Sequence, residues 1–163
     1  MKAFITVGST GFDNLVEAAT QEPFLDCLHR LGFNAVTIQY GSSEPVFQRH
    51  HDSAHLELKG YKYKADITED MASADLIVSH AGSGSILQAL RLDKRLVVMV
   101  NTSLMDNHQL ELAEAMANSN YCIYANSASQ LIDGVQKIMA ERPTPFPDQT
   151  DTFARLLDDH MGY

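Results

Sequence analysis

Residues 75–100 read DLIVSHAGSGSILQALRLDKRLVVMV and contain the pattern that decides the fold. Two short apolar runs, at 75–79 and 95–100, have the length and composition of buried strands. Between them, residues 84–92 place apolar side chains at helical spacing, directly after a loop of glycine and serine. A strand, a helix and a second strand in this order indicate a βαβ unit, in which the two strands run parallel.

The same alternation extends toward both ends of the chain. The predicted elements are strands at 3–8, 34–40 and 121–125, and helices at 67–73, 106–118 and 128–140. We also expect one helical stretch from Leu15 to Leu31, ended by Gly32, and a short helix followed by a strand within 46–64. Strands that alternate with single helices, joined by right-handed crossovers, predict an α/β fold with a Rossmann-like, doubly wound, mostly parallel sheet.

Composition narrows the classes of partner. The 163 residues suit one globular domain, and 12 Lys and Arg against 21 Asp and Glu give a formal net charge of −9. This charge argues against nucleic-acid binding and against attachment to an anionic lipid surface by charge alone. The apolar runs are too short for a membrane span or a signal peptide, and Cys27 and Cys122 lack metal-ligand spacing. We therefore expect a cytoplasmic protein with two buried thiols.

A break in the pattern divides the chain near its carboxyl end. Residues 141–148 read ERPTPFPD, and their prolines favour an extended segment. The predicted organisation is a domain over 1–142, followed by a Pro-rich spacer and a tail helix over 143–163. Phe153, Leu156 and Leu157 recur in the tail at helical spacing. The tail either folds back on the domain or contacts a partner, and the sequence leaves both open.

Small polar residues follow three of the predicted strands. They form the loops Gly8–Gly11 and His80–Ser85, and the cluster Asp106–Gln109. In a doubly wound sheet, ligands bind outside the carboxyl ends of the strands, where helix N-termini expose free N–H groups. Small residues let the backbone approach an anion, and the helix dipole adds about 0.3–1 kcal/mol at exposed sites. Two such loops in one sheet suit a diphosphate ligand.

Several better-known site patterns are absent. The G-x-G-x-x-G pattern that begins at Gly82 fails at Leu87, and the sequence has neither a Walker lysine motif nor a nucleophile elbow. His50, His51 and His55 lack further ligands at a convincing spacing, so no metal site is predicted. A triad of Ser85, His108 and Asp106 can be assembled, but nothing in the spacing requires it.

Four stretches carry a resemblance to one known family. They are SHAGSGSIL at 79–87, KRLVV at 94–98, Asn101, and LMDNHQ at 104–109. Together they resemble the small catalytic subunit of the dolichol-linked UDP-N-acetylglucosamine transferases, which add the second sugar of the N-glycan precursor. Those subunits are similar to the C-terminal half of the bacterial muramyl-peptide N-acetylglucosaminyltransferase, a GT-B glycosyltransferase. The resemblance covers nearly the whole chain.

The resemblance implies a role for each loop. Gly8, Ser9 and Thr10 would lie near the phosphates, and the turn with His80, Gly82, Ser83, Gly84 and Ser85 would hold the diphosphate. Asn107, His108 and Gln109 would face the sugar and the phosphates. Gln88 stands where such transferases usually carry Glu or Asp for the ribose hydroxyls. A neutral acceptor there weakens the hydrogen bond by about 1 kcal/mol, which predicts a several-fold lower affinity for the nucleotide.

The implied reaction is inverting transfer from UDP-N-acetylglucosamine, the donor substrate, to N-acetylglucosamine-diphosphate-dolichol. No other cofactor is implied, because GT-B enzymes need no bound divalent metal. The catalytic base is expected on a membrane-anchored second subunit, with His80 or His108 assisting at most, and that subunit would recruit the chain to the cytosolic face of the endoplasmic reticulum. Two alternatives stay open: a non-catalytic nucleotide-binding interaction module, and a sugar-nucleotide epimerase or hydrolase half-domain.

Overall fold

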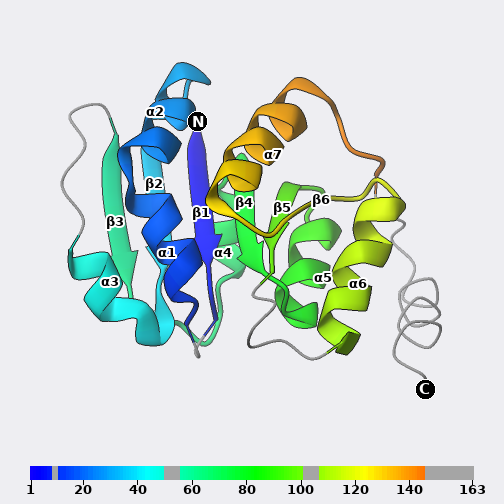
Figure 1. Ribbon diagram of the computed structural model, residues 1–163, viewed down its shortest axis with the longest axis horizontal. Helices are drawn as coiled ribbons and strands as arrows, with labels where there is room; N and C mark the ends of the chain where they lie inside the picture. Colours follow the sequence, from blue (N-terminus) through cyan, green and yellow to red (C-terminus); the bar gives the residue numbers. More distant parts are fainter. Residues whose placement is uncertain (9–10, 50–55, 101–106, 146–163) are drawn as a thin grey trace.

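A computed structural model describes residues 1–8, 11–49, 56–100 and 107–145, and Figure 1 shows how its elements are arranged. The strands are β1 (Lys2–Thr6), β2 (Ala35–Gln39), β3 (Glu57–Tyr61), β4 (Leu76–His80), β5 (Arg95–Met99) and β6 (Ile123–Ala125). The helices are α1 (Asp13–Thr20), α2 (Glu22–Arg30), α3 (Glu44–Gln48), α4 (Thr68–Ala72), α5 (Ser83–Arg91), α6 (Asn107–Asn118) and α7 (Ala128–Ala140). A single 3-10 turn, η1, spans Gly41–Ser43.

The strands form one parallel sheet in the order β3-β2-β1-β4-β5-β6. Strands β2 and β3 extend the sheet on one side of β1, and β4, β5 and β6 extend it on the other. The direction in which strands are added therefore changes between β1 and β4. Ile5 of β1 marks this point, since it pairs with Ile38 of β2 on one side and Val78 of β4 on the other. The expected α/β class with a Rossmann-like, doubly wound sheet is confirmed, and ligands bind in such sheets where the strand order changes direction.

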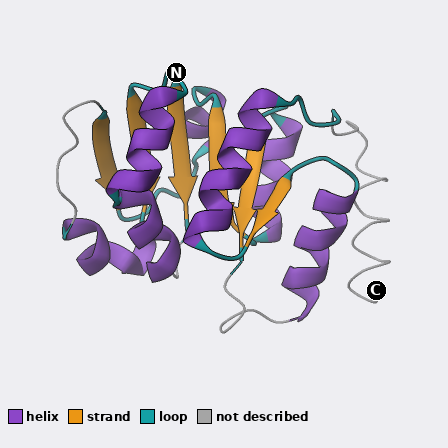
Figure 2. Cartoon of the chain, turned by 45° about the horizontal axis from the view of Figure 1, so that its top comes forward, coloured by secondary structure: helices purple, strands orange, loops and turns teal. Residues whose placement is uncertain are grey.

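Helices cover both faces of the sheet. Helices α1, α2 and α7 pack on one face, and α4, α5 and α6 pack on the other (Figures 1 and 2). Because successive strand residues point to opposite faces, the neighbours Phe4 and Ile5 enter different cores, and both are buried. Burying a side chain of this size stabilises the fold by roughly 1.5–3 kcal/mol. The apolar runs of the sequence are therefore strands with two buried faces.

The helical stretch from Leu15 to Leu31 differs from the expectation, since it is two helices. Helix α1 ends at Thr20 and α2 begins at Glu22, with Pro23 in the first turn of α2. Proline lacks an N–H and fits a first helical turn, so it favours a new start over a continuous helix. Gly32 does end α2: its φ is +97°, and it lies in a Schellman turn with Phe33 N donating to Leu28 O at 3.0 Å.

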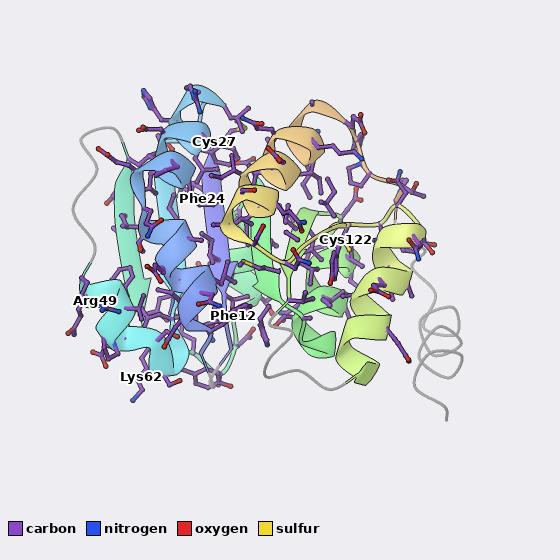
Figure 3. All side chains as sticks on the ribbon, in the orientation of Figure 1. Phe12, Phe24, Cys27, Arg49, Lys62 and Cys122 are labelled. Carbon is purple, nitrogen blue, oxygen red and sulfur yellow. The ribbon has the colours of Figure 1, made fainter. Side chains whose placement is uncertain are left out.

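The less regular region after β2 follows the expected order. It contains α3 and then β3, which pairs in parallel with β2 at the edge of the sheet. The two cysteines are buried, and burial raises the pKa of Cys27 and raises that of Cys122 to about 12. Both thiols are thus held protonated inside the fold, as expected; Figure 3 shows Cys27 beside Phe24 on α2.

Within the residues that the structure describes, no helix combines the length and the apolar character needed to cross a bilayer.

Candidate functional site

The two glycine-containing loops meet at the point where the strand order changes direction. The loop after β1 begins at Val7 and includes Gly8, and the loop after β4 begins at Ala81. Because β1 and β4 are parallel neighbours, their carboxyl ends lie side by side at one edge of the sheet. The structure therefore brings together the two loops that the sequence predicted as a diphosphate site.

The imidazole of His80 fills the space between the loops. A Cβ atom added to Gly82 would lie 2.5 Å from Nε2 of His80, and one added to Gly8 would lie 3.1 Å from its Cε1. Gly8 also has a φ of +67°, which favours glycine over other residues. The ring therefore leaves too little room for a side chain at Gly82 without a shift, and little room for one at Gly8. The predicted catalytic histidine is thus a central part of the junction between the loops.

Burial lowers the pKa of His80, and the Thr6 backbone partly opposes this shift. The ring nitrogen Nδ1 is buried without a well-formed hydrogen bond to any described residue, so the Thr6 contact does not satisfy it. The imidazole is therefore neutral near pH 7, with one nitrogen able to donate and one able to accept. A neutral ring can hydrogen-bond a phosphate oxygen but does not neutralise its charge.

Helix α5 begins at Ser83, three residues after His80. Gly82 precedes the helix with extended backbone angles, and no side chain among the described residues caps it. The N–H groups of the first turn lack partners within the helix, and the helix dipole favours an anion at this end. Gly84 is exposed, and no atom of the described residues lies within 4 Å of the position of its missing Cβ. The arrangement leaves room for close approach by a phosphate, and the predicted phosphate site at this loop stays a prediction.

The β1–α1 loop is anchored on its other side by η1. Ser43 is buried, and its Oγ accepts a hydrogen bond of 2.9 Å from the backbone N–H of Phe12. Gly11, with a φ of +82°, packs so closely that an added Cβ would lie 2.8 Å from the same Oγ. The sequence analysis did not single out Ser43. The GSS run after the second predicted strand was the available signal, because serine hydroxyls commonly satisfy backbone N–H groups in turns.

Gln88 lies on α5 and connects it to α4. Its Nε2 atom donates to Thr68 Oγ1 at 2.7 Å, and Thr68 Oγ1 donates to Asp66 Oδ1 at 2.6 Å. Asp66 precedes α4 and Thr68 is its first residue, at the same edge of the sheet as the glycine loops. The residue predicted to contact the ribose therefore has Thr68 as its hydrogen-bond partner, and Thr68 in turn bonds to Asp66; neither contact was predicted.

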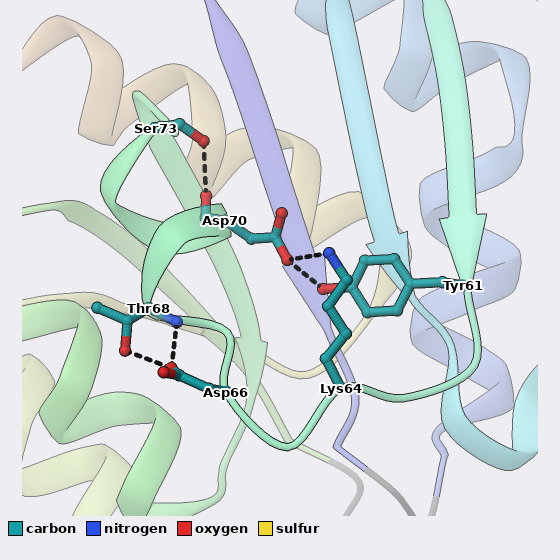
Figure 4. Close-up of polar contacts among 6 residues, drawn as sticks. All are labelled: Tyr61, Lys64, Asp66, Thr68, Asp70 and Ser73. Atoms are coloured by element: carbon teal, nitrogen blue, oxygen red, sulfur yellow. Dashed lines mark hydrogen bonds and ion pairs between the residues drawn. The ribbon is translucent and has the colours of Figure 1, made fainter.

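A second cluster stabilises the connection between β3 and α4. Tyr61 donates its hydroxyl proton to Asp70 Oδ2 at 2.6 Å, and Lys64 Nζ lies 3.2 Å from the same oxygen (Figure 4). Lys64 Nζ also lies 4.4 Å from the centre of the Tyr61 ring. Burial, followed by the hydrogen bond and the charge of Asp70, raises the pKa of Tyr61. Tyr61 therefore stays protonated and holds the connection to α4.

The remaining predicted site residues are only partly described. Ser9 and Thr10 lie outside the described residues, as do Asp106 and the histidines at 50, 51 and 55. Asn107, His108 and Gln109 begin α6, and Ser83 begins α5, but the positions of these side chains lie outside the description. Ser85 is half-buried on α5. A contact between His108 and the two loops therefore stays a prediction. In the described part of the chain, no three His, Cys, Asp or Glu side chains could together hold a metal ion.

The sheet order defines a class, the Rossmann-like, doubly wound α/β domains. Comparison with known proteins is more specific: the model of the glycosyltransferase family 28 C-terminal domain matches residues 2–161. The chain belongs to this family. The UDP-N-acetylglucosamine transferase subunit ALG13 of Yarrowia lipolytica is 35% identical, over 80% of this chain and 68% of that protein. The subunit of the same name from Candida glabrata is 33% identical, over 93% and 94% of the two chains.

Solved structures agree with the family. An NMR solution structure of ALG13 has a TM-score of 0.77 at 29% identity, covering 99% of this chain and 97% of that chain. The crystal structure of Acinetobacter baumannii MurG has a TM-score of 0.62 at 17% identity and shares the fold over 86% of this chain and 41% of MurG. The relatives differ in length. The chain is 36% identical to the Homo sapiens ALG13 subunit but spans only 12% of that protein.

Proposed function

We propose that this chain is the donor-binding subunit of an enzyme that transfers N-acetylglucosamine from UDP-N-acetylglucosamine to N-acetylglucosamine-diphosphate-dolichol. One observation carries the proposal: His80 contacts the positions of Gly8 and Gly82, just before the N-terminus of α5, which no side chain in the described part of the chain caps. This arrangement supports binding of a diphosphate at the switch point of the sheet. The relatives named as UDP-N-acetylglucosamine transferase subunits support UDP-N-acetylglucosamine as the donor.

Local groups must hold the donor against an unfavourable overall charge. The chain carries −9 and the donor is an anion, so long-range attraction does not help binding. Backbone N–H groups of the first turn of α5 donate to the phosphates, and neutral His80 adds one hydrogen bond. In the proposed complex, Asn107, His108 and Gln109 at the start of α6 face the sugar and the phosphates, as the family resemblance implies.

The proposed transfer is inverting. A hydroxyl of the acceptor sugar attacks the anomeric carbon from the side opposite UDP, a new glycosidic bond forms, and the bond from that carbon to the diphosphate oxygen breaks. The electron pair and the negative charge leave with UDP. The contribution of this chain is a set of fixed donors placed where that charge develops, which is commonly a large part of enzymatic rate enhancement.

The proton of the attacking hydroxyl needs a general base. We place this base on a membrane-anchored second subunit, which supplies the acceptor half of the cleft at the cytosolic face of the endoplasmic reticulum. The word "subunit" in the names of the relatives supports a partner of some kind. His80 is neutral and enclosed by two glycines, so it is better suited to holding a phosphate than to taking this proton.

Titration and reconstitution test the proposal. Calorimetry of the chain with UDP, UDP-N-acetylglucosamine and ADP is expected to show binding of both uridine nucleotides and much weaker binding of ADP. Transfer to the lipid acceptor is expected only when the membrane-anchored subunit is added. Equal binding of UDP and ADP would contradict the donor assignment. Binding of UDP without transfer in the mixture would favour a non-catalytic module, and release of free N-acetylglucosamine without acceptor would favour a hydrolase.

A further inference from the structure

Three side chains form a line of hydrogen bonds from the β3–α4 connection to helix α5. Thr68 donates twice to Asp66 Oδ1, from its hydroxyl at 2.6 Å and from its backbone N–H at 2.9 Å (Figure 4). Gln88 Nε2 then donates to Thr68 Oγ1 at 2.7 Å. The three residues lie at the edge of the sheet that carries the glycine loops, and they connect the first turn of α4 to the middle of α5.

Counting protons fixes the direction of every bond in this line. The Thr68 hydroxyl has one proton, and Asp66 takes it. Hydrogen bonds from the hydroxyl and then from the backbone N–H of Thr68 lower the pKa of Asp66, so this carboxylate is ionised and can only accept. Thr68 Oγ1 can therefore only accept from Gln88, which must present its NH2 group. The other end of the amide, Oε1, is left as an acceptor for a different donor.

The family resemblance implies that this donor is a ribose hydroxyl, and the position of Gln88 along α5 is compatible with that assignment. Gln88 lies five residues after Ser83, which is about 7.5 Å along the helix axis. If the phosphates of a nucleoside diphosphate lie at the N-terminus of α5, as the proposed function requires, this distance lets the ribose, the next group along the molecule, reach Gln88. The ribose hydroxyls are donors, and an amide oxygen is a matching acceptor.

We infer that Thr68, held by Asp66, is a positioning residue that fixes the amide of Gln88 so that Oε1 accepts a hydrogen bond from a ribose hydroxyl. The inference rests on the proposed function, because it requires the nucleotide at α5. It also gives a physical reason for glutamine at position 88. A carboxylate at position 88 could only accept a hydrogen bond from Thr68 Oγ1. The one proton of that hydroxyl already goes to Asp66, so two acceptor oxygens would face each other without a proton between them.

The test compares Thr68→Val, which removes the hydroxyl, with Thr68→Ser, which keeps it. Calorimetry measures the affinity of the full chain for UDP and for 2′,3′-dideoxy-UDP, which lacks both ribose hydroxyls. The native chain and Thr68→Ser are expected to prefer UDP. Thr68→Val is expected to lose about three- to tenfold of that preference, the range for one hydrogen bond, with an unchanged melting temperature.

The outcomes separate this inference from the proposed function. If the native chain binds UDP but Thr68→Val weakens both nucleotides equally, Thr68 is only structural and the inference is overturned. If the native chain does not bind UDP, the proposed function fails and the inference fails with it. A second variant pair tests the proton count: Gln88→Glu is expected to strengthen UDP binding in an Asp66→Ala chain and not in the otherwise native chain. An equal gain in both backgrounds would overturn the inference.

Discussion

At the scale of single residues, the site depends on how closely Gly82 approaches His80. Gly82→Ala places a methyl group where Nε2 of His80 would be 2.5 Å away, inside van der Waals contact. Overpacking of this kind costs about 1–3 kcal/mol and displaces the ring. We expect a lower free energy of unfolding by that amount and at least about tenfold weaker UDP binding, measured by denaturant titration and calorimetry.

Gly84→Ala is the matched control for that substitution. It changes the same kind of residue two positions away, where an added Cβ has no neighbour within 4 Å among the residues that the structure describes. Alanine is the better helix former by up to about 1 kcal/mol, so the free energy of unfolding should stay the same or rise. Equal destabilisation by the two substitutions would mean that contact with His80 is not the reason for glycine at position 82.

The buried imidazole makes stability depend on pH in a defined direction. His80 has a pKa below the ordinary value of 6.5 because burial disfavours its charged form. Between the lowered pKa and 6.5 the unfolded chain binds more protons, so the free energy of unfolding falls as pH falls through this range. We expect a larger decrease between about pH 7.5 and about pH 5.5 in the native chain than in His80→Gln. Equal decreases in both proteins would contradict a buried neutral His80.

The sequence predicted the residue types of the site better than their contacts. Glycine and serine after a strand were the basis for predicting Gly82 and Gly84 as site residues, because small residues at a helix start are a local signal. The position of His80 between Gly8 and Gly82 depends on two strands 70 residues apart, so no local pattern carries it. The hydrogen bond between Gln88 and Thr68 is equally non-local and for that reason was not predicted.

At the scale of elements, the helices are held by specific residues at their ends. Ser127 caps α7, its side chain accepting from Gln130 N at 3.2 Å, and Gln130 Oε1 accepts from Asn126 N at 3.0 Å. Ser127→Ala is expected to lower the free energy of unfolding by about 1 kcal/mol, because the helix loses a cap. Ser129→Ala, exposed in the same turn, is the control and should be neutral in a thermal melt. Equal loss in both variants would contradict a capping role.

The boundary between α1 and α2 was not predicted from the hydrophobic pattern of the sequence. Apolar periodicity from Leu15 to Leu31 is continuous, since α1 and α2 both bury their apolar residues against the same face. The pattern reports burial and does not distinguish one long helix from two short ones. Pro23 was the local signal for the break, because proline favours a first turn over a helix interior. By contrast, the alternation of strands and helices predicted the order of the remaining elements correctly.

At the scale of the whole molecule, the last described residues are attached to the domain. Thr144 N donates to Asn120 O at 2.9 Å, and Asn120 Nδ2 donates to Thr144 Oγ1 at 3.2 Å. A deletion of residues 150–163 leaves both contacts in place, so we expect an unchanged melting temperature. We also expect loss of binding to the membrane-anchored subunit, measured by co-purification. Retained binding would contradict a contact between the tail and the partner and favour a tail that folds back on the domain.

We expect the nucleotide to bind at the carboxyl edge of the sheet, between β1 and β4. The change of strand order between β1 and β4, the two glycine loops and the N-terminus of α5 all coincide at one edge of the sheet. Titration of the isotope-labelled chain with UDP, followed by NMR of its amide groups, tests this directly. We expect the largest shifts at Gly8, Gly82 and Gly84. Shifts confined to the opposite edge of the sheet, with these three amides unmoved, would contradict it.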